Sequence, residues 1–286
     1  MHQFSLSLFP LFILLLAGCG ASAPEDDTLH SVSYLGQTPP GMTPERFAPG
    51  EVSTDNLEIE GVFTPEMNEF YFVRQVLGVE PRIYRYRLED NVWLEEEFSE
   101  RIGELFISVD GQSMFLGNQY RERTDSGWSE PQSLGPLFEG YPIMRLTASA
   151  NETYVFDERE EYGILRYSQR IDGVHQAPEP FGPEINSGRL TAHPFIAPDE
   201  SYLIWDSERD GGYGESDLYI SFRKSDGFWG PAINMGPEVN TEGDDTYGTI
   251  TPDGKYFFFQ RIDLDVPEAN IFWMDAQFIE DLRTSQ

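Results

Sequence analysis

A turn followed by an aromatic strand recurs five times along the chain, and this repeat limits the possible folds more than any other feature. The copies are TPEMNEFYFV (64–73), SVDGQSMFLG (108–117), ASANETYVFD (148–157), APDESYLIWD (197–206) and TPDGKYFFFQ (251–260). Their corresponding turn residues, Glu66, Asp110, Asn151, Asp199 and Asp253, are spaced by 44, 41, 48 and 54 residues. A period of this length is typical of the four-stranded blades of a β-propeller.

A second phrase marks another corner of each unit. It reads DSGWSEPQSLGPLFE at 125–139, DGVHQAPEPFGPEIN at 172–186 and DGFWGPAINMGPEVN at 226–240. We interpret it as the turn from the third strand of a blade into the outer fourth strand. Three tryptophans, Trp93, Trp128 and Trp229, are expected to pack between neighbouring sheets, and His175 takes the tryptophan position in its own unit.

The two ends of the repeat region complement each other. The last unit has no W-x-x-P or G-P-E-V-N phrase, whereas an extra segment, RFAPGEVST (46–54), precedes the first unit. The sequence therefore predicts an all-β fold, a five-bladed β-propeller of four-stranded blades, closed by the N-terminal segment as the outer strand of the last blade. Closure of this kind removes exposed sheet edges.

The N-terminus predicts export and lipidation. An apolar run, LSLFPLFILLL, is too short for a stable membrane anchor and leads to Leu16-Ala17-Gly18-Cys19, which resembles the lipobox of bacterial lipoprotein signal peptides. We expect a signal peptide at 1–18, acylation of Cys19 and a flexible tether at 19–33. A plain secretory signal with an incidental cysteine is the alternative. The first residues, MHQFS, depart from both kinds of signal peptide, because they lack the Lys or Arg that is usual there. Gly20 after the cysteine favours the outer membrane, with the domain facing the periplasm.

Charge and cysteine content exclude several classes of protein. The formal net charge of −31 disfavours nucleic acid and anionic lipid surfaces as partners, because both require basic side chains. A cationic ligand is compatible with this charge, although solubility explains it equally well. Cys19 is the only cysteine, so the chain has no internal disulfide and no thiolate metal cluster.

The repeats resemble those of a known family. YLGQTPPGMTPERFAPG (34–50), SERDGGYGESDLYISFRKSDGFWGPAINMGPEVNT and the terminal NIFWMDAQFIEDL are similar to the PD40, or WD40-like, β-propeller repeats of TolB and of many bacterial lipoproteins. The second and third units depart from the pattern, with Val109 and Ala150-Asn151 at the turn. The resemblance implies a single propeller domain at 34–286 and a location in the cell envelope. It implies no particular reaction.

One loop has the residue types of a calcium site. In DSERDGGYGESD (206–217), the acids Asp206, Glu208, Asp210 and Asp217 occupy positions 1, 3, 5 and 12 of an EF-hand-like pattern. The expected flanks are strands instead of helices, and the last position is Asp where the EF-hand has a bidentate Glu. We therefore favour a simple turn and keep calcium as the alternative, with no other cofactor expected.

Three further residues are candidates for ligand contact. Asp244 and Asp245 lie just before an innermost strand, where they would face either the central channel or a solvated rim, which is the interpretation that we favour. His193 lies beside Pro194 at the start of a unit and near the expected channel. No paired histidines with zinc-ligand spacing are present.

The function that these observations favour is binding. We expect a monomeric, lipid-anchored module that binds an envelope protein, a glycan or a peptide through the channel mouth or the blade loops. The sequence lacks a G-x-S-x-G elbow and a phosphate-binding glycine loop. The alternative is a carbohydrate-active enzyme, similar to glycoside hydrolases, that uses carboxylates at the channel. We identify no catalytic residue from the sequence.

Overall fold

The structure is a computed structural model that describes residues 32–159, 163–262 and 268–284. The expected signal peptide (1–18), Cys19 and the tether as far as residue 31 lie outside the described residues. At the start of the described chain, the carbonyl oxygen of Val32 accepts a hydrogen bond from the Trp93 indole at 2.6 Å. Within the described part, no helix has the length and apolar character needed to cross a membrane.

Each repeated turn joins two antiparallel strands, as the sequence predicts. These pairs are β2 (Leu57–Phe63) with β3 (Glu69–Gln75), β6 (Leu105–Ile107) with β7 (Ser113–Leu116), β11 (Ile143–Ala148) with β12 (Tyr154–Glu158), β17 (Arg189–Ile196) with β18 (Tyr202–Glu208), and β21 (Asp244–Ile250) with β22 (Tyr256–Ile262). The residue after each turn acid or amide has positive φ, whether it is glycine, as at Gly111 and Gly254, or not, as at Met67. The turn geometry is therefore conserved between units even where the preferred glycine is missing.

Third and outer strands complete the units. The third strands are β4 (Arg82–Glu89), β8 (Gln119–Thr124), β13 (Leu165–Ser168), β19 (Asp217–Phe222) and β23 (Ala269–Asp275). The outer strands are β5 (Val92–Glu100), β10 (Gln132–Ser133), β16 (Glu179–Pro180), β20 (Ile233–Asn234) and, on β23, β1 (Glu45–Arg46). Smaller elements are the 3-10 turn at Ser33–Gly36 and the strands β9 (Gly127–Trp128), β14 (Arg170–Ile171) and β15 (Val174–His175).

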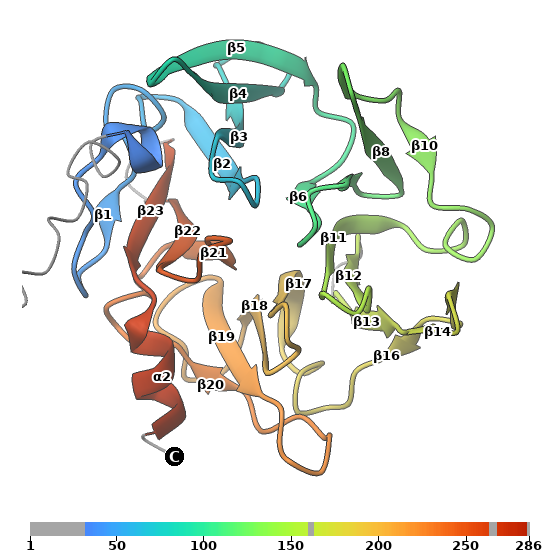
Figure 1. Cartoon of the computed structure of the whole chain (residues 1–286). Helices are drawn as coiled ribbons and strands as arrows, with labels where there is room; N and C mark the ends of the chain where they lie inside the picture. Colours follow the sequence, from blue (N-terminus) through green and yellow to red (C-terminus); the bar gives the residue numbers. More distant parts are fainter. Residues whose placement is uncertain (1–31, 160–162, 263–267, 285–286) are drawn as a thin grey trace, which may run out of the picture.

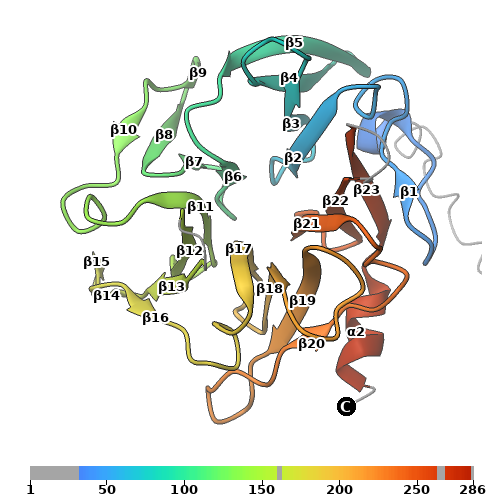
Figure 2. The ribbon, with the colours of Figure 1, turned by 180° about the vertical axis from the view of Figure 1, so that it is seen from behind.

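The sheets are arranged around a common centre, with β2, β6, β11, β17 and β21 innermost (Figures 1 and 2). The first and last units touch side by side, because Leu57 of β2 pairs in parallel with Ala269 of β23. This single pair joins the strands of both units into one sheet in the order β21-β22-β23-β2-β3-β4-β5. On the same edge of β23, opposite the edge that β22 occupies, β1 pairs antiparallel through Glu45 with Trp273.

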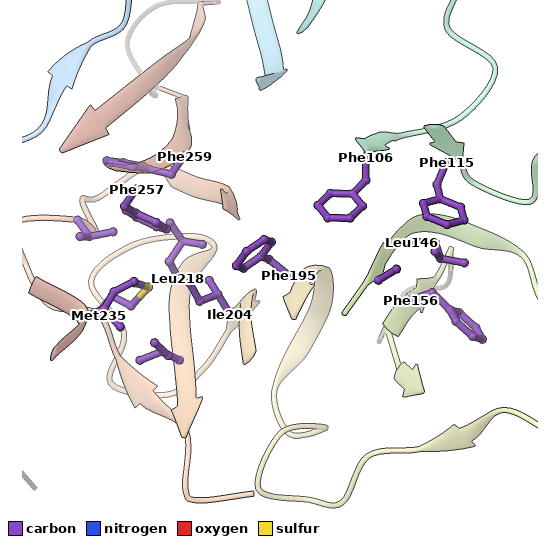
Figure 3. Packing of buried hydrophobic residues seen from close by; sticks show 14 of the residues in the cluster. Phe106, Phe115, Leu146, Phe156, Phe195, Ile204, Leu218, Met235, Phe257 and Phe259 are labelled. Carbon is purple, nitrogen blue, oxygen red and sulfur yellow. The ribbon is translucent and has the colours of Figure 1, made fainter. Parts of the chain in front are cut away.

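The hydrophobic core lies between neighbouring sheets. Figure 3 shows part of the largest cluster, in which Phe106 and Phe195 approach each other from different units, with ring centroids 6.3 Å apart. On β22, Phe257 and Phe259 belong to this cluster, whereas Phe258 packs on the opposite face against Trp273. The aromatic second strand is therefore buried on both faces, as its nearly continuous apolar sequence indicates.

The tryptophan positions act as packing points between sheets, as predicted. The Trp128 indole packs against side chains of the first and second units and donates a hydrogen bond to the Tyr71 hydroxyl at 2.9 Å. Trp229 lies edge-on against Phe181 of the preceding unit at 5.9 Å. His175 packs against Tyr154 with ring centroids 4.0 Å apart, which confirms its role as a substitute packing residue.

A C-terminal helix, α2 (Gln277–Thr284), was not anticipated from the sequence. It begins where the Asp275 carboxylate accepts the backbone N–H of Gln277 at 2.9 Å, a local cap that satisfies one free donor. Phe278 and Ile279 are buried in the large core cluster, and the Arg283 guanidinium lies over the Phe222 ring. The segment that we expected merely to end the last unit therefore packs across units four and five.

Candidate binding site in the central channel

One polar residue from each repeat unit faces the centre of the molecule. These residues are Glu60, Glu104, Arg145, His193 and Tyr247, and each lies six positions before the turn residue of its unit. We call this set the channel ring. On β2, β11, β17 and β21 the strand register shifts at this position, as it does at a β-bulge, and Glu104 directly precedes β6. The bulges turn these side chains out of the sheets toward the channel.

The bulge conformation is strained in three of the five units. Glu60, His193 and Tyr247 have φ values of 62°, 47° and 56°, which non-glycine residues rarely adopt. Strain of this kind persists only where surrounding contacts fix it, and it is frequent at functional sites. After Tyr247 the chain needs a glycine, because a Cβ on Gly248 would lie 2.8 Å from a methyl carbon of Ile204.

Side chains of the channel ring contact one another directly. The Tyr247 hydroxyl donates a hydrogen bond to Glu104 Oε1 at 2.9 Å. The His193 ring stacks on the Tyr247 ring with centroids 3.8 Å apart, and the Arg145 guanidinium lies 5.4 Å from the centre of the same ring. Residues of four units, separated by up to 143 positions in the sequence, therefore form one polar cluster.

Two buried aspartates from second strands hold the bulges in place. Asp157 accepts the backbone N–H groups of Arg145 at 2.7 Å and of His193 at 2.8 Å. Asp206 accepts the backbone N–H of Tyr247 at 3.2 Å and faces Nδ1 of His193 at 2.9 Å. Each carboxylate thus links two neighbouring units, and the hydrogen bonds compensate for its removal from water.

Glu60 is fixed by an arginine outside the ring. The Arg101 guanidinium reaches Glu60 Oε1 through Nε at 3.0 Å and Nη2 at 2.5 Å, and Glu60 Oε2 accepts the backbone N–H of Leu105 at 2.8 Å. Glu60 has no side-chain exposure, whereas Arg101 retains partial contact with solvent. Burial raises the pKa of Glu60, and the positive charge of Arg101 opposes this increase.

A cavity of about 740 Å³ opens above the ring. Glu104, His193 and Tyr247 line it, together with Arg159, Leu190 and Asp244 nearer its mouth. Two residues further along the inner strands the channel becomes apolar: Val62, Phe106 and Phe195 line a separate cavity of about 190 Å³. The channel therefore has a larger chamber, lined by charged groups and by apolar side chains, and a smaller cavity lined mainly by apolar side chains.

The buried and charged environment raises the pKa values of His193 in the ring and of Asp157 beside it. Burial lowers the pKa of His193, but the negative charges of Asp206, Glu104 and Asp157 outweigh burial and raise it to about 9. Burial and the charge of Glu104 raise the pKa of Asp157 to about 6, although His193 and two backbone N–H groups oppose the shift. At neutral pH the free protein therefore has an imidazolium among buried carboxylates.

We expect the free energy of unfolding to fall as the pH rises from 6.5 to about 9, because His193 binds its proton more tightly in the folded state than in the unfolded chain. The His193 contribution is fully present below its unfolded pKa of 6.5 and is lost above its folded pKa of about 9. The difference corresponds to about 3 kcal/mol at most. Urea denaturation of the full chain in EDTA at several pH values measures it.

The matched variant is His193→Gln, which should show a flatter profile over the same range. Protonation of Asp157 affects the free energy of unfolding in a separate, lower pH range, between its unfolded pKa of 3.8 and its folded pKa of about 6. Parallel profiles for the wild type and the variant between pH 6.5 and 9 would show that His193 is not the titrating group.

Of the three residues that the sequence suggested for the channel, the structure places two at the channel and one away from it. His193 belongs to the channel ring, and Asp244 lines the cavity while accepting the backbone N–H of Ser216 at 3.1 Å. Asp245 is buried on the other side of its strand, where it pairs with Arg261 at 2.8 Å. Only one of the two adjacent aspartates can face the channel, because successive side chains on a strand point to opposite faces.

The four acids of the 206–217 loop do not share a centre. Asp206 points to His193, and Glu208 pairs with Arg189 at 3.5 Å. Asp217 accepts the backbone N–H of Tyr213 at 2.7 Å and so closes its own loop, while Asp210 is exposed. This geometry is that of a turn stabilised by its own aspartate, the interpretation that the sequence favoured.

Sequence reasoning missed most of the ring. Glu60, Glu104, Arg145, Tyr247 and the supporting Asp157 were not identified as candidates. The available signal was positional: the residue six places before each turn residue is polar in all five units. The residue types differ from unit to unit, so the position does not stand out as a motif when each unit is inspected alone.

No family model and no curated protein sequence matches this chain. Solved structures with a similar fold include endo-arabinase from Bacteroides thetaiotaomicron VPI-5482 (12% identity, 84% of this chain, 97% of that chain, TM-score 0.48) and TolB from Acinetobacter baumannii (12%, 76%, 54%, 0.45). The periplasmic gluconolactonase of Pseudomonas aeruginosa is a third (11%, 71%, 64%, 0.43).

All three proteins have β-propeller folds. This chain is all-β by its own strands, and its structural neighbours are propeller-like. The matches cover about half of the TolB chain and less than two thirds of the gluconolactonase chain. At these identities the likeness concerns the fold alone.

Proposed function

We propose that the chain is a five-bladed β-propeller of the cell envelope, anchored through Cys19, that binds a small polar ligand in the chamber above the channel ring. The observation that carries the proposal is the ring itself. Three of its five side chains, those of Glu104, His193 and Tyr247, line a cavity of about 740 Å³. Such a concave site with a few convergent polar groups is the usual form of a small-molecule site.

The proposed blade count rests on the five pairs of inner strands and on the pairing at the chain ends. β1 lies on β23 as a fourth strand, which supports closure of the ring by the N-terminal segment. Phe47, directly after β1, extends this contact by packing against residues of both the first and the last unit. Without β1, the outer edge of β23 would expose unpaired backbone groups.

The lining of the chamber indicates the chemistry of the ligand. Carboxylates of Glu104 and Asp244 and the cationic groups of Arg101 and Arg159 line the chamber, together with apolar side chains such as those of Ile59, Met144 and Leu190. A ligand with hydroxyl, amide or mixed charged groups fits this lining better than a hydrocarbon. A glycan fragment or a short peptide of the envelope is therefore the ligand class that we propose.

Catalysis on a glycan is the second candidate. One observation favours it: Glu104 and Asp157 offer carboxylate oxygens within 4.8 Å of each other, and the pKa of Asp157 is raised to about 6. Paired carboxylates with separated pKa values are the machinery of glycoside hydrolases. We place it second because Asp157 is fully buried and both of its oxygens already accept backbone N–H groups.

Ligand binding is tested by calorimetric titration of the full chain, purified in detergent, with oligosaccharides, peptidoglycan fragments and short peptides. We expect one class to bind and to raise the melting temperature by mass action. The variant Leu190→Trp should abolish binding, because its indole would fill the mouth of the chamber. Chromatography of the same mixtures for cleaved products separates binding from catalysis.

The control for that titration is Leu77→Trp, which adds the same side chain at a fully exposed position outside the chamber lining. It should bind the ligand like the wild type. Equal binding by the wild type and Leu190→Trp would place the ligand elsewhere on the molecule, and the absence of binding to every member of the panel would contradict the proposed ligand class.

A further inference from the structure

Three residues of the channel have the arrangement of metal ligands. Glu104, Asp157 and His193 each offer one ligand atom, and these atoms all lie within 4.8 Å of one another. They come from the second, third and fourth repeat units, so only the assembled fold brings them together. Among the described residues, this is the one group of three or more such side chains that meets this distance.

The orientation of His193 suits a metal ligand. Its Nδ1 lies 2.9 Å and 3.0 Å from the two carboxylate oxygens of Asp206, so a neutral imidazole donates Nδ1–H to Asp206 and presents the lone pair of Nε2 to the opposite side. A carboxylate behind the histidine is the usual support of a metal-bound imidazole, because it fixes the tautomer and the ring orientation. Asp206 is thus a positioning residue in this arrangement.

The spacing between Nε2 of His193 and Glu104 supports the same conclusion. The distance to Glu104 Oε1 is 3.7 Å, which is too long for a hydrogen bond. Two ligand atoms bound at about 2.1 Å to one tetrahedral ion are separated by roughly 3.4 Å. A small closure of the two side chains would therefore bring both within reach of a shared ion.

The unpaired carboxylate oxygen of Glu104 is an independent indication of a metal site. It is 3% exposed, and its Oε2 atom is buried without a hydrogen-bond partner in the structure. A buried carboxylate oxygen that lacks a partner is unfavourable by a few kcal/mol, roughly 1 to 3. The Tyr247 hydroxyl and the Arg101 guanidinium both donate to Oε1, so Oε2 remains available to another group.

Charge balance also accommodates a divalent ion. The deep part of the channel holds four carboxylates, those of Glu60, Glu104, Asp157 and Asp206, and two guanidinium groups, those of Arg101 and Arg145. Metal binding through Nε2 displaces the proton of the imidazolium, and with the resulting neutral His193 the sum is −4 + 2 = −2. One divalent cation neutralises this charge, which matters because unbalanced buried charge is costly.

We propose that the channel ring and the adjacent Asp157 bind a divalent transition-metal ion of the zinc class through Nε2 of His193 and carboxylate oxygens of Glu104 and Asp157. Each Asp157 oxygen accepts one backbone N–H and keeps a second lone pair for the ion. A nitrogen ligand combined with two carboxylates suits such an ion better than calcium or magnesium, which prefer oxygen ligands alone. The chamber leaves room for a further ligand on the open side, from water or from a bound molecule. The inference shares the chamber with the proposed function but needs no organic ligand.

The test uses the full chain stripped with EDTA and titrated with Co²⁺, Zn²⁺ and Ca²⁺, with calorimetry for all three ions and visible absorption for Co²⁺. We expect one equivalent to bind and the Co²⁺ spectrum to show ligation by nitrogen. His193→Gln and Glu104→Gln should abolish this binding. Asp206→Asn, which removes the negative charge behind the histidine and keeps an oxygen that can accept the Tyr247 N–H, should weaken it by about 10- to 100-fold.

The matched control is Asp210→Asn in the exposed 206–217 loop, which should bind metal like the wild type. Circular dichroism and the melting temperature establish that each variant is folded. Failure of the folded wild type to bind either ion, or unchanged affinity in His193→Gln, would overturn the inference. So would binding that prefers Ca²⁺ and is lost in Asp210→Asn, because it would move the site to the loop. Metal binding and the glycan or peptide titration are measured separately, so either proposal can fail alone.

Discussion

Replacing Phe47 by alanine should lower the free energy of unfolding by about 3 to 5 kcal/mol, the range found when a large aromatic side chain is removed from a core. Phe47 has no solvent exposure. Its ring centroid lies 5.0 Å from that of Phe70 in the first unit, and 4.8 Å and 5.1 Å from those of Phe258 and Trp273 in the last. Truncation would leave a cavity at the junction where the two ends of the chain meet.

The measurement is urea denaturation of the full chain, with Phe228→Ala as the control. Phe228 is 72% exposed, so its truncation should change the stability by less than about 0.5 kcal/mol. If the N-terminal segment closes the propeller, Phe47→Ala should also increase proteolysis at the edge of β23. Equal stability of the two variants would show that this segment is not part of the cooperative fold.

Replacing Arg101 by methionine should have a comparable effect, about 3 to 5 kcal/mol at pH 7.5, because it leaves the buried Glu60 carboxylate without its counter-ion. Arg101 makes two contacts with Glu60 Oε1, and Glu60 has no exposure to solvent. The pKa of Glu60 is already raised by burial, and it should rise further without Arg101. The destabilisation should therefore shrink as the pH falls and Glu60 takes up a proton.

A double variant distinguishes the loss of the Glu60–Arg101 ion pair from non-specific destabilisation by the substitution. Glu60→Gln keeps an oxygen acceptor for the Leu105 N–H and removes the charge, so Glu60→Gln combined with Arg101→Met should be more stable than Arg101→Met alone. Arg82→Met is the surface control: Arg82 pairs with the exposed Glu100 at 3.1 Å and should contribute less than about 1 kcal/mol. Equal losses for Arg101→Met and Arg82→Met would refute the argument.

The sequence alone predicted the strand plan because its determinants are local. A turn such as Thr251-Pro252-Asp253-Gly254 fixes backbone angles within a few residues, and the Gly254 φ of 75° is the value that such a turn requires. The run Tyr256–Phe259 is apolar on both faces, so it can only be a strand buried between two sheets. These features depend on near neighbours, and the structure reproduces them unit by unit.

The calcium-like pattern shows why the spacing of acids along the chain could not by itself decide between a turn and a metal site. Asp206 occupies the first position of that pattern, but it is also the residue of β18 that pairs with Ala192 of β17. Strand alternation and the bulge after Ala192 aim its side chain at His193 instead of at the loop. The spacing of acids along the chain was real, whereas their convergence required a loop conformation that the strand does not allow.

The repeat, the turns and the burial of the aromatic strands were thus determined by the sequence, since short-range backbone preferences and hydrophobic patterning specify them. The meeting of Glu104, Asp157 and His193 was decided only by the tertiary structure. These residues lie on separate units, and the strands and turns of each unit were predicted from that unit's sequence alone. Their distances depend on how the sheets pack around the centre and on bulges that turn individual side chains inward, and both are properties of the assembled ring.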